Sequence, residues 1–304
     1  FVAQDQAAIP NVGTSQTDGA TPVHPSTATL TTPIGYALPA NGFFTFNGIP
    51  LSGTVTVGTA GTYATFNGPA GLFNAINTNG LNGDLTVRVI SDISETAYTP
   101  LGKQSEFCGT GYHIRITPNN NTVRTITGTN GQTMIDISGA FSMTIDGRDP
   151  SNLAGGARNL IFRNSSLFPA IRFNNGAKDD SLMYCQVQSK VQSSTQGGGV
   201  VTIGGPLIVG TTNLDNIVLY ENKISYPTNI GSPVLADIPQ LGIQFQGSAT
   251  SSVTNLVIKR NSIFNFQTSA IATMNPSTGI GNSYIGNGAV VDSNRIYQTF
   301  NIPT

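Results

Sequence analysis

Charge is scarce in this sequence of 304 residues, and tryptophan is absent from it. Charged side chains make up 10% of the chain, against about 25% in a typical globular protein. The hydrophobic fraction of 38% still permits a buried core, which disordered chains of high charge lack. A net charge of −1 gives no electrostatic attraction to nucleic acid or to an anionic membrane, so we expect neither as a partner.

Long apolar runs are also missing. Since no run of about 18 apolar residues occurs, the sequence predicts no transmembrane segment. The chain starts at Phe1 rather than at Met, and we therefore expect a processed, secreted product. Thr, Asn, Ser and Gly take the place of charged residues, a composition common among exported surface proteins.

Metal-binding and redox residues are few. There are two cysteines, Cys108 and Cys185, and two distant histidines, His24 and His113. An extracellular cysteine pair can form a disulfide, while two buried free thiols are the alternative, because Cys packs well as a small apolar residue. Metal sites need more ligands than these residues offer. We expect no metal site and no cofactor, with Ca²⁺ the one ion left open.

The N-terminal segment differs in composition from the rest of the chain. Residues 1–50 are rich in Pro, Thr, Ala and Gly and show little sustained periodicity, which predicts an extended arm or linker. The arm either lies along the fold, the interpretation that we favour, or adds a strand to a neighbouring subunit. Residues 51–304 are then the main predicted domain.

Strand-forming residues dominate that domain. Residues 53–66 and 85–91 alternate as strands do. Between them, the spacing of Leu72, Phe73 and Ile76 predicts a short amphipathic helix within residues 68–80.

The remainder of the chain repeats itself, in NLIFRNSSL (159–167), SLMYCQV (181–187), NIVLYENKI (216–224), NLVIKRNSI (255–263) and VVDSNRI (290–296). The last apolar residues of the copies are Leu167, Val187, Ile224, Ile263 and Ile296. Five positions earlier each copy is again apolar, at Phe162, Leu182, Leu219, Ile258 and Val291. Two positions before the last apolar residue stand Ser165, Cys185, Asn222, Asn261 and Asn294.

A second alternating motif is interleaved with the first, in AIRFNNG (170–176), GVVTIGG (199–205), GIQFQGS (242–248) and AIATMNP (270–276). Two short strands per repeat cannot bury both faces alone, so we predict that successive coils stack and bury their inward side chains in columns. The column of Asn222, Asn261 and Asn294 fits a tight turn, because Asn tolerates left-handed backbone and stacked Asn side chains can hydrogen-bond to one another.

The N-L-x-I-x-x-N-x-I strings resemble the parallel β-helix proteins of the pectate-lyase-like superfamily. The phrases YATFNGPAGLFNAINTNG (63–80), TIDGR (144–148), NLIFRNSS (159–166) and AIRFNNGAKDDSLMYCQV (170–187) are similar to large exported β-helix proteins of Bacteroidota. The resemblance extends over residues 53–300. It implies an all-β, right-handed parallel β-helix with a short N-terminal capping helix, and export to the cell surface, often by a type IX route.

Many β-helix proteins cleave polysaccharides, which requires acidic residues clustered on one outer face. This chain has only 15 acidic residues, most of them isolated. The pair Asp179–Asp180 lies in NNGAKDDS, and Asp146 and Asp149 lie in TIDGRDP, both of which are typical of turns. We interpret all four as turn residues, with a glycan or cation contact as the alternative. A polysaccharide lyase or glycoside hydrolase is therefore not favoured.

A β-helix must also cover its two ends, where unpaired backbone and apolar residues would otherwise be exposed. The 68–80 helix is suited to the N-terminal end. At the other end the sequence runs to RIYQTFNIPT (295–304) directly after a repeat. We therefore expect a secreted structural or adhesive protein that self-associates head to tail into fibres through its arm and its uncapped end. A carbohydrate-binding or polysaccharide-degrading protein is the alternative.

Overall fold

The computed structural model describes residues 2–4, 12–14, 49–191, 199–204, 213–227, 238–247, 252–266, 278–283 and 287–299. The chain divides into two units, residues 1–45 and 46–304. In the first unit, β1 (Val2–Gln4) and β2 (Val12–Thr14) pair as a two-stranded antiparallel sheet. This sheet was not expected in an extended arm, and the rest of residues 1–48 lies outside the described ranges.

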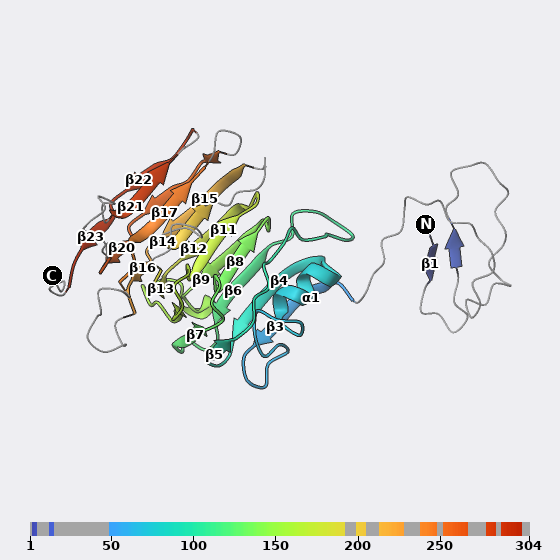
Figure 1. Ribbon diagram of the computed structural model, residues 1–304. Helices are drawn as coiled ribbons and strands as arrows, with labels where there is room; N and C mark the ends of the chain where they lie inside the picture. Colours follow the sequence, from blue (N-terminus) through green and yellow to red (C-terminus); the bar gives the residue numbers. More distant parts are fainter. Residues whose placement is uncertain are drawn as a thin grey trace. The chain divides into compact units, whose positions relative to one another are not determined.

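The described part of the second unit is built mostly of strands, arranged in three sheets whose strands all run parallel (Figure 1). Sheet 1 consists of β3 (Leu51–Val57), β4 (Leu81–Val89), β6 (Ile114–Pro118), β9 (Met143–Asp146), β12 (Lys178–Met183), β15 (Leu214–Tyr220), β18 (Val253–Thr254), β19 (Val257–Lys259) and β22 (Val290–Asp292). Sheet 2 consists of β5 (Ile93–Glu95), β7 (Arg124–Gly128), β10 (Leu160–Asn164), β13 (Cys185–Ser189), β16 (Lys223–Ser225), β20 (Ser262–Phe264) and β23 (Arg295–Tyr297). Sheet 3 consists of β8 (Ile135–Ser138), β11 (Ile171–Asn174), β14 (Gly199–Gly204), β17 (Leu241–Gln246) and β21 (Thr278–Ser283).

The chain visits these sheets in rotation. From β6 onward successive strands enter sheets 1, 2 and 3 in turn, with β18 as an extra short strand of sheet 1. We call one such passage a round. Each strand pairs with the strand one round earlier, so that Leu182 lies beside Leu219, Leu219 beside Ile258 and Ile258 beside Val291. This arrangement of parallel sheets is compatible with the predicted parallel β-helix.

The core consists of columns of apolar side chains that follow from this register. In sheet 2 one column is Ile93, Ile126, Phe162, Val187, Ile224, Ile263 and Ile296. All but the last of these are buried. Burying such a side chain contributes ~1.5–3 kcal/mol, and the columns are therefore the main source of stability.

Most of the predicted alignment of the repeats is confirmed, but the alignment of the first copy, residues 159–167, is wrong. Phe162 lies in sheet 2 beside Val187 instead of in sheet 1 beside Leu182. Leu167 is 48% exposed and lies outside any strand, and Ser165 donates its hydroxyl to Gly128 O. The reason is that residues 159–167 supply one strand, β10, whereas the later copies cross from sheet 1 into sheet 2.

The sequence predicts two strands per repeat, whereas the structure has three. The reason is that the first motif contains one strand of sheet 1 and one strand of sheet 2. Three copies of the second motif supply β11, β14 and β17 of sheet 3. The fourth copy, residues 270–276, lies outside the described residues, and the next described strand that pairs with β17 is β21.

The turn from sheet 1 to sheet 2 brings Asn222, Asn261 and Asn294 together in a hydrogen-bonded ladder. The Oδ1 atom of Asn222 accepts the backbone N–H of Cys185 at 2.9 Å, and its Nδ2 donates to Leu182 O at 2.8 Å. Asn261 Oδ1 in turn accepts from the backbone N and the Nδ2 of Asn222, at 2.9 and 3.0 Å. Asn294 Oδ1 accepts from Asn261 in the same way.

The left-handed backbone of this turn belongs to the residue before each ladder position, which corrects the expectation that Asn itself would adopt it. The left-handed residues are Tyr184, Glu221, Arg260 and Ser293, with φ between 51° and 58°. A second left-handed column, with φ between 49° and 56°, lies where the chain enters sheet 1, at Ser142, Asp179, Asn216 and Asn255.

The end of the sheets at β3 and β5 is closed by helix α1 (Leu72–Asn79) and the loop before it (Figure 1). Leu72, Phe73 and Ile76 are fully buried, and the helix ends at Gly80, whose φ of 69° disfavours any residue with a side chain. The buried Glu95 carboxylate holds the loop by accepting the backbone N–H groups of Phe66 and Asn67. The short 3₁₀ helix η2 (Pro150–Asn152) follows β9.

We predict that Asn261→Ala destabilises the protein by about 3 kcal/mol, because it leaves the buried Asn222 N–H and the Leu219 carbonyl without partners. The matched variant Asn294→Ala acts on the last, half-buried position of the ladder, where water can replace the side chain, and should cost about 1 kcal/mol. Urea denaturation measures both losses. Equal losses at the two positions would contradict the ladder.

Candidate functional site

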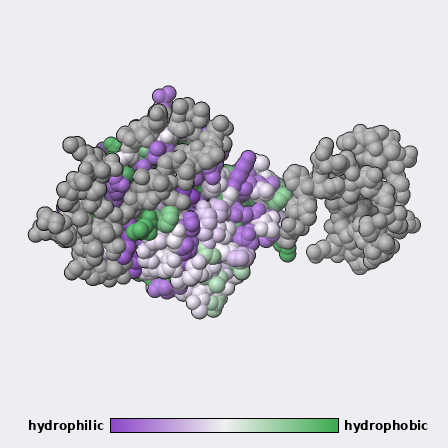
Figure 2. Space-filling view, viewed as in Figure 1, coloured by the Kyte–Doolittle hydropathy of each residue, from purple (hydrophilic) through white to green (hydrophobic). Residues whose placement is uncertain are grey.

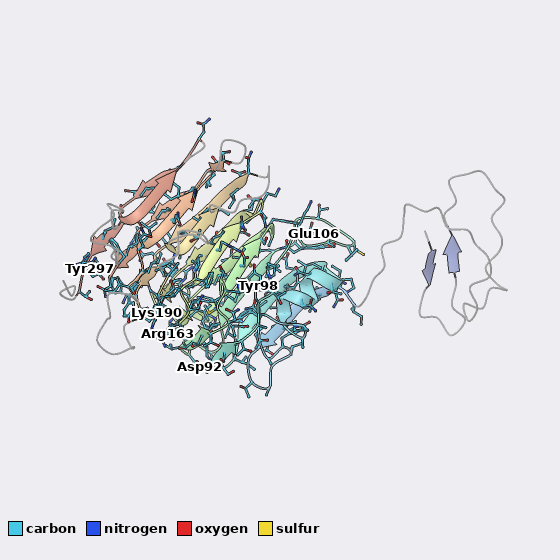
Figure 3. All side chains as sticks on the ribbon, in the orientation of Figure 1. Asp92, Tyr98, Glu106, Arg163, Lys190 and Tyr297 are labelled. Carbon is cyan, nitrogen blue, oxygen red and sulfur yellow. The ribbon has the colours of Figure 1, made fainter. Side chains whose placement is uncertain are left out.

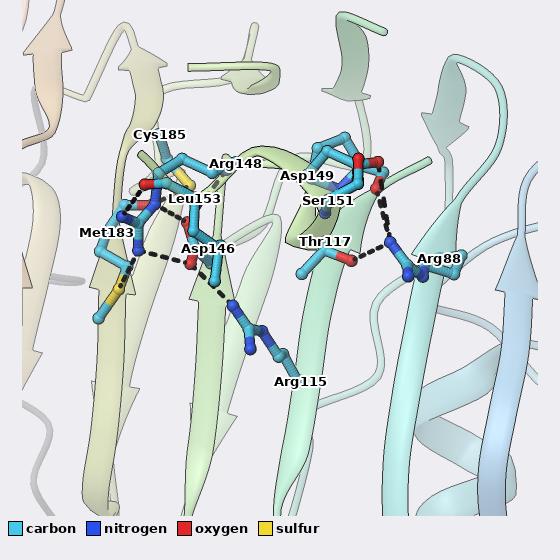
Figure 4. A network of polar contacts seen from close by, with 11 residues as sticks. Arg88, Arg115, Thr117, Asp146, Arg148, Asp149, Ser151, Leu153, Met183 and Cys185 are labelled. Atoms are coloured by element: carbon cyan, nitrogen blue, oxygen red, sulfur yellow. Dashed lines mark hydrogen bonds and ion pairs between the residues drawn. The ribbon is translucent and has the colours of Figure 1, made fainter. Parts of the chain in front are cut away.

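The four aspartates singled out in the sequence are separated by the fold. Asp146 ends β9 and is buried, in contact with two arginines (Figure 4). Its Oδ1 accepts the Nε of Arg148 at 3.0 Å, and its Oδ2 accepts from Arg148 Nη2 at 2.9 Å and from Arg115 Nη2 at 3.1 Å. The Arg148 guanidinium also lies 3.8 Å from the centre of the Tyr184 ring. Asp146 therefore holds the turn after β9 to the neighbouring strand β6.

Asp149 caps the 3₁₀ helix that follows this turn. Its Oδ1 accepts from the backbone N and the hydroxyl of Ser151, and its Oδ2 accepts from Asn121 N at 3.0 Å (Figure 4). Burial alone would raise the pKa of Asp149, but these hydrogen bonds and the charge of Arg88 lower the pKa overall. Asp149 is therefore an ionised carboxylate whose oxygens are already bound, and it cannot act as a general acid near neutral pH.

Asp179 and Asp180 lie inside strand β12, which corrects the expectation of a turn outside the sheets. Asp179 has the left-handed backbone, is exposed, and accepts a hydrogen bond from Asn216 Nδ2 at 2.9 Å. Asp180 is fully buried. The two side chains differ because the left-handed residue of each round is followed by a residue that faces the core.

Asp180 accepts a hydrogen bond in the same way as a ladder asparagine, but in the turn where the chain enters sheet 1. Its Oδ1 accepts the backbone N–H of Met143, one round earlier, at 3.0 Å, as Asn222 Oδ1 accepts that of Cys185. Its Oδ2 is buried and has no hydrogen-bond partner among the described residues, where Asn222 has a donating NH₂ group. Burial raises the pKa of Asp180 well above its usual range; the Met143 N–H opposes this shift and the charge of Asp179 adds to it.

We predict that Asp180→Asn stabilises the protein at neutral pH. A carboxyl whose pKa is raised by folding contributes its stability below the ordinary Asp pKa and loses it as the pH rises through the raised value. An amide of the same shape carries no charge at any pH, so the gain should be of the order of 1 kcal/mol at neutral pH and should shrink toward acid pH.

Urea denaturation at a series of pH values measures this difference, and Asp179→Asn, which changes the exposed neighbour, is the matched control. A loss of stability at neutral pH in Asp180→Asn would show that the buried carboxylate is favoured as the anion.

Both cysteines are free, so the disulfide that the sequence left open is not formed. Cys108 is exposed, whereas Cys185 is buried in β13 and donates its thiol to Met183 O. Burial raises the pKa of the Cys185 thiol well above its usual range, and the charge of Asp146 contributes to this shift. A buried neutral thiol reacts slowly.

We therefore predict that the native protein exposes one thiol to Ellman's reagent and that unfolding in denaturant exposes a second. Cys108→Ser should abolish the native reaction and leave one thiol that reacts only after unfolding. Two unreactive sulfurs in the denatured, unreduced chain would instead indicate a disulfide.

Aromatic residues occur both in the core and on the surface. Tyr226 and Phe266 are buried. Tyr184 and Tyr220 are half-buried neighbours at the end of sheet 1, with ring centres 5.7 Å apart and nearly perpendicular planes. Arg148 lies over the Tyr184 ring and Arg260 lies 5.8 Å from the centre of the Tyr220 ring, so that each ring has a guanidinium where a sugar would stack.

The outermost described strands of sheets 1 and 2, β22 and β23, present an apolar edge. Val290, Val291 and Ile296 are 47%, 51% and 50% exposed, whereas Ile258 and Ile263, the equivalents of Val291 and Ile296 one round earlier, are fully buried. Tyr297, labelled in Figure 3, lies at the same end, and its ring stacks on Phe264 at 5.0 Å. Among the residues coloured in Figure 2, pale and hydrophilic residues predominate, and hydrophobic residues form small patches. We call β22 and β23 the open edge.

Two polar clusters were not predicted, because their members lie far apart in sequence. Asp136 of β8 accepts hydrogen bonds from Arg172 and from Tyr98, one round later and one round earlier. Glu221 pairs with Arg158 at 3.0 Å and with Arg260 at 2.7 Å. In both clusters the carboxylate joins residues of different rounds.

No group of three or more His, Cys, Asp or Glu side chains suited to a metal ion occurs within the described residues. In the same ranges, no helix combines the length and the apolar character needed to cross a lipid bilayer. Comparisons of this chain with family models, with curated proteins and with solved structures find no match.

Proposed function

We propose that the chain is a right-handed parallel β-helix that serves as a secreted structural or adhesive protein and self-associates through its open edge. Right-handedness is supported by the rule that crossovers between parallel strands of one sheet have this hand in nearly all proteins. Export to the cell surface, and kinship with the exported β-helix proteins of Bacteroidota, are supported by the low charge and by the sequence phrases quoted above.

The observation that carries the proposal is the open edge. A terminal strand offers unpaired N–H and C=O groups, which makes it a template for another strand unless it is covered or charged. Here the two apolar columns of Leu182 and Val187 continue to Val291 and Ile296 and are half-exposed at that point. A partner at this edge would bury them as the preceding round buries Ile258 and Ile263.

The proposed occupant is the N-terminal segment, residues 1–50, of a second copy of the chain. The opposite end of the sheets is less suitable, because α1 and the loop bound by Glu95 already bury its apolar residues. The N-terminal segment contains no Lys or Arg and forms strands at β1 and β2, so it offers a chain that can pair without bringing a positive charge to the edge. Such a contact joins two different surfaces and does not close, which produces filaments.

A structural role is further supported by the way the acidic residues are used. Asp146, Asp149, Asp136 and Glu221 all bind groups of this chain, and Asp180 lies in the core. A glycosidase of the usual type needs two carboxyl groups that face a common cleft. The arrangement therefore favours a structural or adhesive protein over the alternative of a polysaccharide-degrading enzyme.

We predict that the wild-type protein associates with rising concentration and that Val291→Glu or Ile296→Glu raises the dissociation constant at least about tenfold, because burying an unpaired charge at the contact is costly. Sedimentation velocity and negative-stain images provide the measurement. Val123→Glu, at an equally exposed valine away from the open edge, is the matched control and should associate as the wild type does.

A wild-type protein that stays monomeric at all concentrations would overturn the proposal. A photo-reactive amino acid placed in β23, followed by mass spectrometry, identifies the occupant of the edge: links from β23 to residues 1–50 support the N-terminal segment. Links from β23 to β23 would replace it with symmetric pairing of two open edges.

A further inference from the structure

A hollow of about 360 Å³ lies where the chain passes from sheet 3 to sheet 1 in successive rounds. Its principal side chains are Lys103, Ser138, Phe141, Asn175, Lys178 and Asn213. Gly139 and Gly176 complete the lining, and their φ angles of 91° and 85° require glycine, which keeps the floor free of side chains. We call this hollow the basic groove. Its size is within the range of small-molecule sites, ~300–1,000 Å³.

Neither cation of the basic groove has a close carboxylate partner among the described residues. Most described arginines form ion pairs within 4.0 Å, whereas neither Lys103 nor Lys178 does so with any described residue. Asp215 is the register partner of Lys178, and hydrogen bonds from Thr254 and Asn255, at 2.7 Å each, lower its pKa with a smaller contribution from the charge of Lys178. Two exposed ammonium groups therefore lie at one hollow without an ion pair to any described residue within 4.0 Å.

The groove also offers an aromatic ring and free amide groups. Phe141 pairs with Lys178 across adjacent rounds, which places the Lys178 Nζ 5.9 Å from the centre of the Phe141 ring. Asn175 donates its Nδ2 to Ser138, and Asn213 accepts the Ser252 N–H on its Oδ1. Within the described ranges, Asn175 Oδ1 and Asn213 Nδ2 have no hydrogen bond, so one acceptor and one donor remain available.

From this combination we propose that the basic groove binds one unit of an acidic saccharide. The two ammonium groups would bind the carboxylate or sulfate group of such a sugar, because both groups are oxyanions. Asn175 and Asn213 would bind ring hydroxyls, and the half-buried Phe141 ring would contact the apolar face of the sugar. The proposal rests on the groove alone and does not depend on association at the open edge.

Calorimetric titration of the full chain with four probes tests the proposal: glucuronate, glucose 6-sulfate, neutral glucose and inorganic sulfate. We expect the two charged sugars to bind at up to millimolar concentration, more weakly as salt is added, and glucose to bind at least about tenfold more weakly because it has no group for the lysines. The stronger of the two charged sugars identifies the oxyanion. Inorganic sulfate should bind less tightly than the charged sugars, since it cannot use Phe141 or the amides.

Lys103→Gln and Lys178→Gln should each lower the affinity for the charged sugars about tenfold. Lys223→Gln removes an exposed lysine of β16 that has no described ion pair either, and it should bind as the wild type does. Phe141→Leu should reduce the preference for charged sugars over inorganic sulfate.

No binding of any charged probe, or equal binding by the groove variants and the wild type, would overturn the proposal. Equal affinity for sulfate and both charged sugars would reduce the groove to a general anion site and would likewise overturn it. Sedimentation of Lys103→Gln should match that of the wild type, so that a failure of this proposal and a failure of self-association can be told apart.

Discussion

The second unit depends on one constraint, the pairing of each parallel strand in register with the strand one round earlier. This register places equivalent residues beside each other, and a single apolar position in the repeat therefore becomes a continuous column such as Ile126, Phe162, Val187, Ile224 and Ile263. The register holds although the rounds differ in length. Paired residues are 29 positions apart at Ile114 and Met143 and 42 apart at Val201 and Ile243. Length varies in the connections, where it costs little.

Stacking imposes a matching demand on the turns. A left-handed residue changes the direction of the chain, and the residue after it faces inward with a backbone N–H that needs an acceptor. Asn meets this demand because its amide accepts the N–H of the previous round and donates to a carbonyl at the same time. Asp180 accepts the N–H of the previous round but offers no donor for a carbonyl, and one of its oxygens has no partner among the described residues. The same geometry thus explains both the asparagine ladder and the raised pKa of a buried carboxyl.

Much of the fold was predictable from the sequence, because columns leave a periodic trace. The inward positions Leu182, Leu219 and Ile258 and the three ladder asparagines were all found by aligning short strings. The third strand of each round was missed because the Asn turn is so tight that two strands read as one string. Phe162 was misplaced for a related reason, since the loop after β9 separates its round into two pieces.

Polar contacts between rounds were not predictable. Arg172 and Tyr98 are 74 positions apart, and no local motif connects either of them to Asp136. Lys103 and Lys178, the cations of the basic groove, likewise lie two rounds apart. Asp179–Asp180 was recognised as a pair, but the burial of one member and not the other follows from the left-handed backbone at Asp179, which two adjacent aspartates do not reveal.

The closure at α1 gives the second unit two mechanically different ends. Contacts in a stack of rounds are mainly between neighbours, so cohesion is the sum of one interface after another. A pull along the stack would then detach the outermost round first, at β22 and β23, where Val291 and Ile296 have the least packing to lose. The end held by Phe73, Ile76 and Glu95 would yield last. Under tension such a molecule would lengthen stepwise, losing one round at a time from the β22–β23 end, instead of unfolding all at once.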